Sequence, residues 1–515
     1  MIIDELAFRI RSAMGLTPTD EQYHAIDEVC RFLTDRHDRV TMVLRGSAGT
    51  GKTTLAAAVV RALKQLNQQL VLMAPTGRAA KVFSLYSGMP ASTIHRRIYR
   101  QRQAGDLMSS FQLNYNVAKD TLFVVDEASM ISNGRGEWRE ESGEWRGDRG
   151  LLDDFVEYVY GGRNCRLLLI GDRAQLPPVG EEESPALSAD VLRSYYLRVY
   201  EADLNQVLRQ SEESGILWNA TRLRNLSPCL LEGEGEQLPL PKIRFKGFPD
   251  IHVVTGDELI DQLGTSYSRA GTDDTIVITR SNKRANIYNQ GIRNTVLDRD
   301  EELCRGDMLM IVKNNYSIIP SPNTQHPSPN THHPSPNTQP PSPNTQHPSP
   351  NPPFDFIANG DRAVVRRVRN EQELYGFRFA DVTLSFPDYD DYELTCKVLL
   401  DTLMSEAPAL TREQQTKLYE GVLADYQDIR FKSERMKKLK EDRFYNALQV
   451  KFAYAVTCHK AQGGQWAHVY IDQGYMTDDM FTPDYFRWLY TAFTRATEQL
   501  FLVNWPEKFV MHNSQ

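Results

Sequence analysis

Residues 46–53 read Gly-Ser-Ala-Gly-Thr-Gly-Lys-Thr, which is the spacing G-x-x-x-x-G-K-T. Glycines at this spacing let backbone N–H groups wrap phosphates, the lysine reaches the β- and γ-phosphates, and the threonine hydroxyl coordinates Mg²⁺. An apolar run at 41–44 precedes the motif and a helical stretch at 55–66 follows it, which is the context that the motif requires. The sequence therefore predicts a site for a nucleoside triphosphate and Mg²⁺. We expect the following residues to bind the nucleotide: Gly46, Ser47, Ala48, Gly49, Thr50, Gly51, Lys52, Thr53 and Thr54.

Two acidic residues, Asp126 and Glu127, end a second apolar strand candidate at 121–125. Carboxylates at the C-terminal end of a parallel strand face the ligand crevice. We expect Asp126 to hold the Mg²⁺ shell with Thr53, and Glu127 to accept a proton from the attacking water. A third strand candidate at 166–170 leads into residues 171–180, where Gln175 is a candidate to orient that water or to sense the γ-phosphate. The alternative is a surface glutamine in a turn made rigid by prolines.

These residues must be positioned by short apolar runs that alternate with helical stretches. Most runs are apolar on both faces, as parallel strands covered by helices are. The runs are 41–44, 70–74, 121–125, 166–170, 275–279, 308–312, 468–471 and 500–503. They fall into two sets, one before about residue 201 and one after about residue 274, so the chain is predicted to be an α/β protein with two such domains.

The composition excludes some classes of protein and leaves the partner open. A chain of 515 residues is too long for one core. Six scattered cysteines without a C-x-x-C pair argue against a zinc site and a disulfide framework. No apolar run reaches the roughly 20 residues that cross a bilayer, and the N-terminus lacks a signal peptide, so we expect a cytoplasmic protein. The net charge of −8 does not exclude nucleic acid, because a basic channel can lie in an acidic protein.

Residues 321–348 hold four near-copies of the unit S-P-N-T-Q-H-P, and a fifth begins at 349. Frequent prolines and the lack of apolar residues predict a disordered loop. Metal binding through His326, His332, His333 and His347 is the alternative, but their spacing fits no compact ligand set. A smaller repeat, G-E-W-R, occurs at 136–139 and 143–146. A β-like region at 356–386 and a charged helical stretch at 411–444 predict a small inserted domain.

The order of the motifs resembles that of superfamily 1 helicases of class B, with the RecD/Dda-like group, in its compact form, most similar. The resemblance rests on 16–22, 74–80, 92–95, 126–129, 171–180, 208–210, 279–283, 454–463 and 489–496. It implies that ATP is the nucleotide, that Gln22 reads the adenine, and that Arg209 and Arg495 face the nucleotide across a domain cleft. It also implies single-stranded DNA contacts from Thr76, His95, Phe111, Asn282, Thr457, His459 and Lys460.

Each of these residues has a simpler structural alternative. His95 and His459 are also consistent with structural histidines, and Thr76 with a helix cap. Arg209 and Arg495 are also consistent with surface ion-pair partners, and Phe111, the candidate wedge at the tip of a pin, with a packed aromatic.

The resemblance implies two RecA-like P-loop NTPase domains with parallel sheets, a small pin hairpin and an inserted small β-barrel. We expect the first RecA-like domain at 1–95 and 119–205, and the pin at 96–118. The second RecA-like domain is expected at 206–315 and 450–515, the proline-rich repeat at 316–355, and an SH3-like barrel with a helical arm at 356–449.

The implied function is ATP hydrolysis coupled to 5′-to-3′ movement on single-stranded DNA and to duplex unwinding. Two alternatives stay open: an RNA-directed helicase of the same superfamily, and a DNA-dependent ATPase switch or loader that does not unwind. Expected partners are single-stranded DNA and duplex junctions, with single-strand-binding, replication or repair proteins as candidates, and a monomer is expected. Roles in DNA repair and recombination are implied only by the family, as is the direction of movement.

Overall fold

The computed structural model describes residues 2–101, 111–134, 149–207, 213–232, 240–315, 317, 357–477 and 480–511. The side chains of 100, 101, 111 and 227–232 are not described. Arg209, the proline-rich repeat with its histidines and both G-E-W-R units lie outside the described residues. Within the described part of the chain, no helix is long and apolar enough to cross a membrane.

The first sheet has six strands, and every ladder in it is parallel. Its order is β3 (Ala91–Thr93), β2 (Gln69–Ala74), β6 (Thr121–Val125), β7 (Arg166–Gly171), β1 (Val40–Gly46) and β8 (Arg198–Leu204). Successive side chains alternate between two cores: Met42 and Leu44 of β1 join one cluster and Val43 joins the other. This alternation explains why these runs are apolar throughout, since both faces of the sheet are covered.

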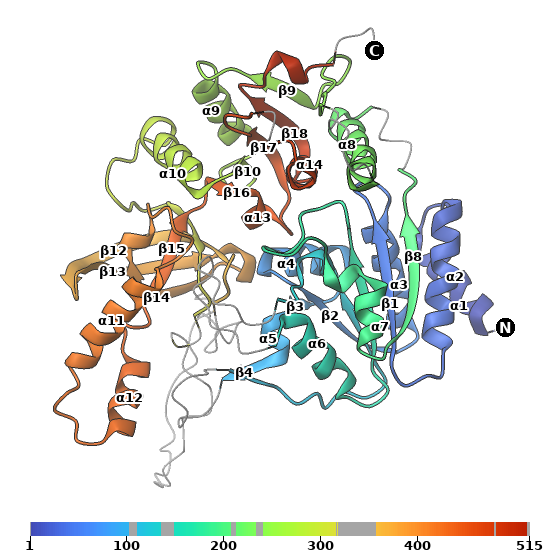
Figure 1. The fold of residues 1–515 in the computed structure, drawn as a ribbon, viewed down its shortest axis with the longest axis horizontal. Helices are drawn as coiled ribbons and strands as arrows, with labels where there is room; N and C mark the ends of the chain where they lie inside the picture. The colour runs from blue at the N-terminus through green and yellow to red at the C-terminus, as the bar shows by residue number, and fades with distance from the viewer. Residues whose placement is uncertain are drawn as a thin grey trace, which may run out of the picture.

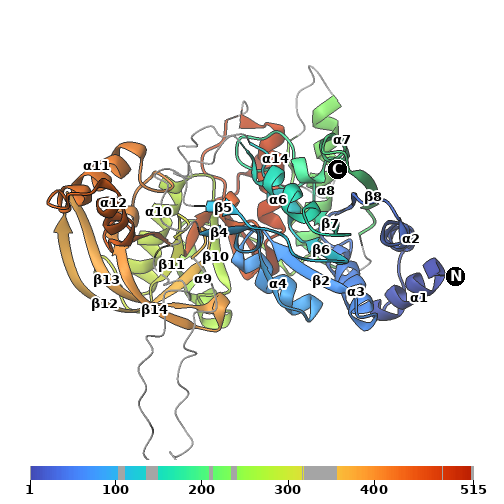
Figure 2. The same ribbon diagram turned by 90° about the horizontal axis from the view of Figure 1, so that it is seen from below.

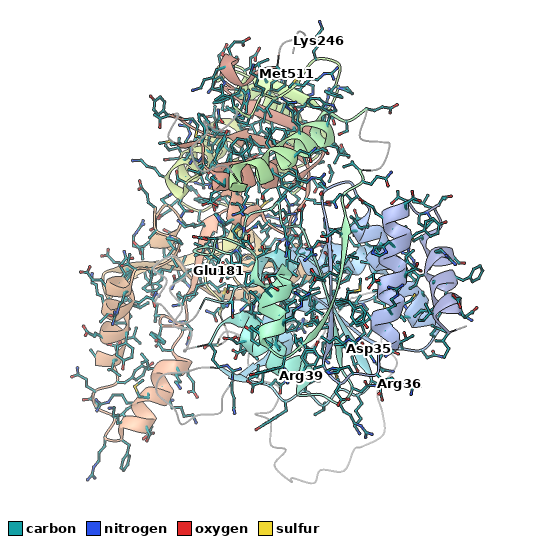
Figure 3. The ribbon with its side chains drawn as sticks, turned by 45° about the vertical axis from the view of Figure 1, so that its right-hand side comes forward. Asp35, Arg36, Arg39, Glu181, Lys246 and Met511 are labelled. Atoms are coloured by element: carbon teal, nitrogen blue, oxygen red, sulfur yellow. The ribbon has the colours of Figure 1, made fainter. Side chains whose placement is uncertain are left out.

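Helices cover both faces of the first sheet (Figure 1). One face packs against α1 (Ile2–Met14), α2 (Asp20–Thr34), α3 (Lys52–Gln65) and α4 (Gly77–Ser87). The other packs against α5 (Ile94–Ile98), α6 (Leu151–Tyr160) and α7 (Ala189–Ser194). At the sheet end opposite the P-loop, Asp35 accepts hydrogen bonds from Tyr200 and pairs with Arg198, which ties the end of α2 to β8 (Asp35 is labelled in Figure 3).

The second sheet has five strands, and its ladders are also parallel. Its order is β16 (Ala455–Thr457), β10 (Thr275–Thr279), β17 (Trp466–Asp472), β18 (Ala496–Val503) and β9 (Ile251–Val254). The helices that accompany it are α8 (Gly215–Glu232), α9 (Leu259–Arg269), α10 (Asn282–Gly291), α13 (Cys458–Ala461) and α14 (Pro483–Phe493). Two helix-covered parallel sheets, the first with a P-loop, confirm the prediction of two RecA-like domains.

A closed five-stranded barrel is the third body of the fold. It consists of β11 (Met308–Ile311), β12 (Arg362–Leu374), β13 (Phe377–Phe386), β14 (Tyr392–Leu399) and β15 (Leu448–Phe452). Two helices, α11 (Arg412–Ala424) and α12 (Lys432–Glu441), pack on it through a separate apolar cluster. Figure 2 shows the barrel and these helices at the opposite end of the molecule from α1 and α2.

One strand prediction is wrong. The run 308–312 was expected in the second parallel sheet, but β11 pairs antiparallel with β12 and β15 of the barrel. All four residues of β11 are buried, and they belong to the same core cluster as the second RecA-like domain. A strand buried on both faces has the same apolar pattern in a parallel sheet and in a barrel that packs on a neighbouring domain, so the pattern could not separate the two.

A two-stranded antiparallel hairpin rises from the first domain after α5. It pairs β4 (Tyr99–Gln101) with β5 (Phe111–Leu113). Both ribbon views place it between the α11–α12 arm and the first sheet (Figures 1 and 2). Its place in the sequence falls inside the predicted pin, 96–118.

Candidate nucleotide-binding cleft

The P-loop connects the end of β1 to the first turn of α3, which begins at Lys52. Gly49 and Gly51 have φ values of +78° and +79°, a left-handed conformation that only glycine adopts without strain. A Cβ on Gly46 would lie 2.8 Å from Oγ1 of Thr50, so the loop also needs this glycine for space. The N-cap residue Gly51 has no side chain to cap the first-turn N–H groups of α3, which leaves them for an anion.

The side chain of Gln22 contacts the P-loop from α2 of the same domain. Its side chain is buried, its Nε2 donates to the Thr50 carbonyl at 2.9 Å, and its Oε1 accepts from the N–H of Thr19 at 3.0 Å. The second contact is half of a capping box that begins α2. The structure therefore places Gln22 against the P-loop, and its predicted contact with adenine stays a prediction.

Asp126 and Glu127 lie at the carboxyl end of β6, two strands away from β1 in the same sheet. Asp126 Oδ1 accepts the N–H of Glu127 at 2.9 Å. Burial and the charge of Glu127 raise the pKa of Asp126 to about 6, and the positive charge of Lys52 opposes this rise. Lys52 therefore lies within electrostatic reach of the acidic pair, as the predicted site requires.

Two buried oxygen atoms of the cleft are without partners. Oε2 of Glu127 and Oε1 of Gln175 accept no hydrogen bond from the described residues. Gln175 is 3% exposed, so the alternative of a surface glutamine is wrong. Buried acceptors are normally satisfied, and here a water in the cleft could donate hydrogen bonds to both. These acceptors, together with the Thr53 hydroxyl and the Asp126 carboxylate, fit a site for Mg²⁺ and a triphosphate.

Arg495 enters the cleft from the second domain and is 3% exposed. Its guanidinium donates to the Thr491 carbonyl at 3.0 Å, the Gly464 carbonyl at 3.2 Å and the Thr494 hydroxyl at 3.0 Å. These contacts aim Nη1 across the cleft, where it lies 4.0 Å from Oε1 of Glu127. Such burial does not agree with the alternative of a surface ion pair.

Sequence reasoning did not select Tyr490 and Asp172, which connect the two domains. The Tyr490 hydroxyl donates to Asp172 Oδ2 at 2.5 Å and accepts the N–H of the P-loop residue Ala48 at 2.9 Å. Burial raises the pKa of Asp172, while the charge of Lys52 and the Tyr490 hydroxyl oppose the rise. Both residues lie inside motifs that the sequence identified, but a motif does not say which of its side chains cross the cleft.

Two further hydrogen bonds cross the cleft beside Tyr490. The N–H of Leu176 donates to the Thr491 hydroxyl at 2.8 Å, and the Gln462 side chain donates to the Leu176 carbonyl at 2.7 Å. Residues 171–180 of the first domain are thus held by α14 and by the turn after α13 of the second domain.

The predicted DNA contacts follow the carboxyl ends of strands in both sheets. Thr76 and His95 follow the neighbouring strands β2 and β3, while Asn282 follows β10 and Thr457 is the last residue of its neighbour β16. His459 is exposed in α13, and the side chain of Phe111 is not described. The structure therefore gathers most of these residues at two matching sheet edges, and their contact with DNA stays a prediction.

The two edges meet at Thr76. Its Oγ1 accepts the N–H of Ala79 at 3.2 Å, so the helix-cap alternative is confirmed. Gly463, which ends the motif 454–463 just after α13, has a φ of +71°. A Cβ there would lie 3.0 Å from Thr76 Oγ1 and from Ala79 Cβ. A cap and a DNA contact do not exclude each other, because a hydroxyl can also donate.

The barrel packs on both sheet edges. Lys460 donates to Asn359 Oδ1 of the barrel at 2.6 Å. On the first domain, Gly77 packs so closely that a Cβ there would lie 2.5 Å from Asp361 Oδ1. Asp361 accepts the Tyr389 hydroxyl at 3.0 Å and the N–H of Ala358 at 2.8 Å, and burial raises its pKa to about 7.

Two family descriptions match parts of this architecture. An AAA domain matches residues 17–137, and a UvrD-like helicase C-terminal domain matches residues 452–503. The ATP-dependent DNA helicase dda of Enterobacteria phage T4 is 25% identical over 57% of this chain and 60% of its own length. The ATP-dependent RecD2 DNA helicase of Deinococcus radiodurans is 34% identical over 34% of this chain and 20% of its own length. The chain thus spans less than two thirds of either relative.

A solved structure of a Pif1 helicase from Bacteroides, in complex with ADP-AlF3 and ssDNA, covers 97% of this chain and 95% of its own. Its sequence identity to this chain is 13% and its TM-score is 0.42.

The two parallel sheets and the P-loop between them define the class: a protein with two RecA-like domains that meet at a nucleotide cleft. Within that class, the chain is similar to the dda and RecD2 DNA helicases, and parts of it match an AAA domain and a UvrD-like helicase C-terminal domain.

Proposed function

We propose that this protein hydrolyses ATP in the cleft between its RecA-like domains and uses the cycle to move 5′-to-3′ along single-stranded DNA and unwind duplex. The observation that carries the proposal is the position of Arg495. A buried guanidinium from the second domain lies 4.0 Å from the predicted general base of the first. An arginine supplied across a cleft stabilises the charge of phosphoryl transfer only when the cleft is closed.

The residues of the P-loop side bind and orient the nucleotide. Lys52 and the first-turn N–H groups of α3 hold the β- and γ-phosphates, and Thr53 and Asp126 would hold Mg²⁺. When bound, the metal neutralises charge on the phosphate oxygens. Glu127 accepts a proton from the water that attacks the γ-phosphorus, Gln175 orients that water, and ADP and inorganic phosphate leave.

Hydrolysis is coupled to movement through the bonds that cross the cleft. Tyr490, Thr491 and Gln462 make hydrogen bonds across the cleft in this structure, and these would be lost when the domains open. Opening breaks these bonds and also separates Gly463 from Thr76, which lie at the sheet edges with the predicted DNA contacts. Alternating closure would move these edges relative to one another along a strand. Contacts to phosphates without base recognition suit such movement.

The direction is taken from the RecD/Dda-like group, and one assay tests it together with unwinding. Two duplexes of identical sequence, one with a 5′ tail and one with a 3′ tail, are incubated with the protein and ATP. We expect strand separation of the 5′-tailed duplex only. Separation of the 3′-tailed duplex alone would reverse the direction. ATP consumption without any separation would instead identify a switch or loader.

A second assay tests the nucleic acid. ATP turnover is measured with single-stranded DNA and with single-stranded RNA of the same sequence. We expect stimulation by DNA, and greater stimulation by RNA would favour the RNA-directed alternative.

A further inference from the structure

Arg224 belongs to α8 of the second domain, yet its side chain reaches the P-loop. Its Nη1 donates to the Ser47 hydroxyl and, at 3.4 Å, to the Asn205 carbonyl. Figure 1 shows α8 between the second sheet and the first domain. No motif in the sequence pointed to this residue.

The start of α8 packs on the same loop. A Cβ on Gly49 would lie 3.2 Å from Cγ1 of Val207 and 3.3 Å from Cδ2 of Leu217. Leu217 and Arg224 are two helical turns apart, and both contact the loop, so α8 lies alongside the phosphate cradle. Arg224 is therefore held at the cradle by the packing of its own helix.

In the part of the chain that the structure describes, no carboxylate balances the positive charge of Arg224. Its hydrogen-bond partners are a hydroxyl, a carbonyl and the side-chain oxygen of Asn225, all neutral. Among the described residues, no acidic side chain lies within ion-pair distance of it. Arg45, at the end of β1, provides a contrast, since it pairs with Glu201 at 2.7 Å and Asp203 at 2.6 Å. An unbalanced guanidinium beside a loop built for phosphates suits an anionic ligand.

Ser47 is the second residue of the loop that surrounds the phosphates. The charge of Arg224 also acts on Tyr490: burial and Asp172 raise the pKa of that tyrosine, and Arg224 opposes the rise. Tyr490 itself binds the N–H of Ala48, the next loop residue. Arg224 thus lies at the Ser47–Ala48 edge of the cradle, on the side that faces the second domain.

From these contacts we infer that Arg224 binds the terminal phosphate of ATP and contacts Ser47 when that phosphate is absent. The inference rests on the proposed function, because it assigns a ligand at the same cleft. It gives the second domain a further cation for the phosphate, in addition to Arg495 and the predicted Arg209. Because α8 packs on α14, which ends beside Arg495, the binding of ATP by Arg224 would favour closure of the cleft. ADP, which lacks the terminal phosphate, would not make this contact.

The test compares Arg224→Ala with Arg222→Ala in the full chain. Arg222 is exposed on the same helix and makes no contact with the loop in the hydrogen bonds and ion pairs of the described residues. Affinities for AMP-PNP, a non-hydrolysable ATP analogue, and for ADP are measured by calorimetry. We expect Arg224→Ala to weaken AMP-PNP binding about 10- to 100-fold, the range of a charge-assisted contact. ADP binding should change less than about twofold, Arg222→Ala should match the wild type, and Arg224→Lys should lie between.

The outcomes separate this inference from the proposed function. If the wild type binds neither nucleotide, the proposed function fails and the inference with it. If the wild type binds both and Arg224→Ala behaves like Arg222→Ala, only the role of Arg224 is overturned. An equal loss of AMP-PNP and ADP affinity would likewise overturn it, because Arg224 would then only support the loop. The melting temperature of each variant verifies that it folds.

Discussion

Nη1 of Arg495 lies 4.0 Å from Oε1 of Glu127, although the two residues come from different RecA-like domains and are separated by most of the chain. At this distance the pair is not a strong ion pair, and the arginine is fixed mainly by the carbonyls of Thr491 and Gly464. Its position is therefore set by its own domain before any nucleotide binds. Such preorganisation is what electrostatic stabilisation of a transition state requires.

Replacing Arg495 should reduce the rate of ATP hydrolysis much more than the affinity for ATP. Arg495→Ala removes the cation from the closed cleft, so we expect ATP turnover to fall about a thousandfold or more. ATP affinity should fall much less, since the P-loop side is intact. Steady-state turnover and equilibrium binding measure the two effects. A turnover within tenfold of the wild type would contradict the proposed role.

Lys52→Ala should abolish ATP turnover and leave DNA binding largely intact. Lys52 begins α3 at the phosphate loop, whereas the predicted DNA contacts lie after β2, β3, β10 and β16. Turnover and fluorescence anisotropy with a labelled strand provide the two measurements. Retained turnover would refute the assignment of the P-loop.

The raised pKa of Asp361 predicts that the free energy of unfolding depends on pH. Burial raises its pKa in the folded protein to about 7, from an ordinary value of 3.8. Between these values the folded protein holds a proton that the unfolded chain has released, so the free energy of unfolding falls as pH rises through this window. Asn cannot titrate, and the melting temperature of Asp361→Asn relative to wild type should therefore rise from pH 4 to pH 7. Asp190→Asn, at an exposed carboxylate, should show no such trend.

Gly77→Ala should disturb the contact between barrel and first domain. The added methyl would lie 2.5 Å from Asp361 Oδ1 and 2.9 Å from the Tyr389 hydroxyl, both buried or half-buried. We expect a loss of about 1–3 kcal/mol in the free energy of unfolding, the usual range for overpacking. Gly264→Ala in α9 is the control, because nothing lies within 4 Å of its Cβ position. Denaturant titration measures both, and equal stability of the two variants would exclude a tight contact at Gly77.

Deleting residues 321–350 should leave unwinding close to that of the wild type. The N–H groups of Asn315 and Ile357 each donate to the carbonyl of the other at 2.8 Å, so the chain leaves and re-enters the barrel at one place. Shortening the connection therefore need not move β11 or β12. A large loss of unwinding rate, with ATP turnover retained, would show that the repeat takes part in the reaction.

The features that the sequence predicted best are those determined by neighbouring residues: the strands and the P-loop. The strands 121–125 and 275–279 match β6 and β10 residue for residue, because apolar runs end there in acids or polar caps. The P-loop was placed from the spacing of its glycines, lysine and threonine together with the flanking strand and helix. By contrast, the run 308–312 carried no sign of its barrel partners, which begin more than fifty residues later.

The contacts across the cleft could not be predicted in the same way. Tyr490 and Asp172 are 318 residues apart, and Arg224 and Ser47 are 177 apart. Nothing in local composition specifies which side chain of a helix meets a loop of another domain. The motif for Arg495 identified the right helix end, but its distance to Glu127 depends on how both sheets pack.

Gly463 limits how near the two domains can come. It lies against Thr76 and Ala79 with no room for a methyl group, at the point where the two predicted DNA-binding edges touch. Any side chain at this position would hold the two domains further apart. The missing Cβ of one glycine therefore lets these two edges touch, and in the proposed cycle it would set the end point of closure.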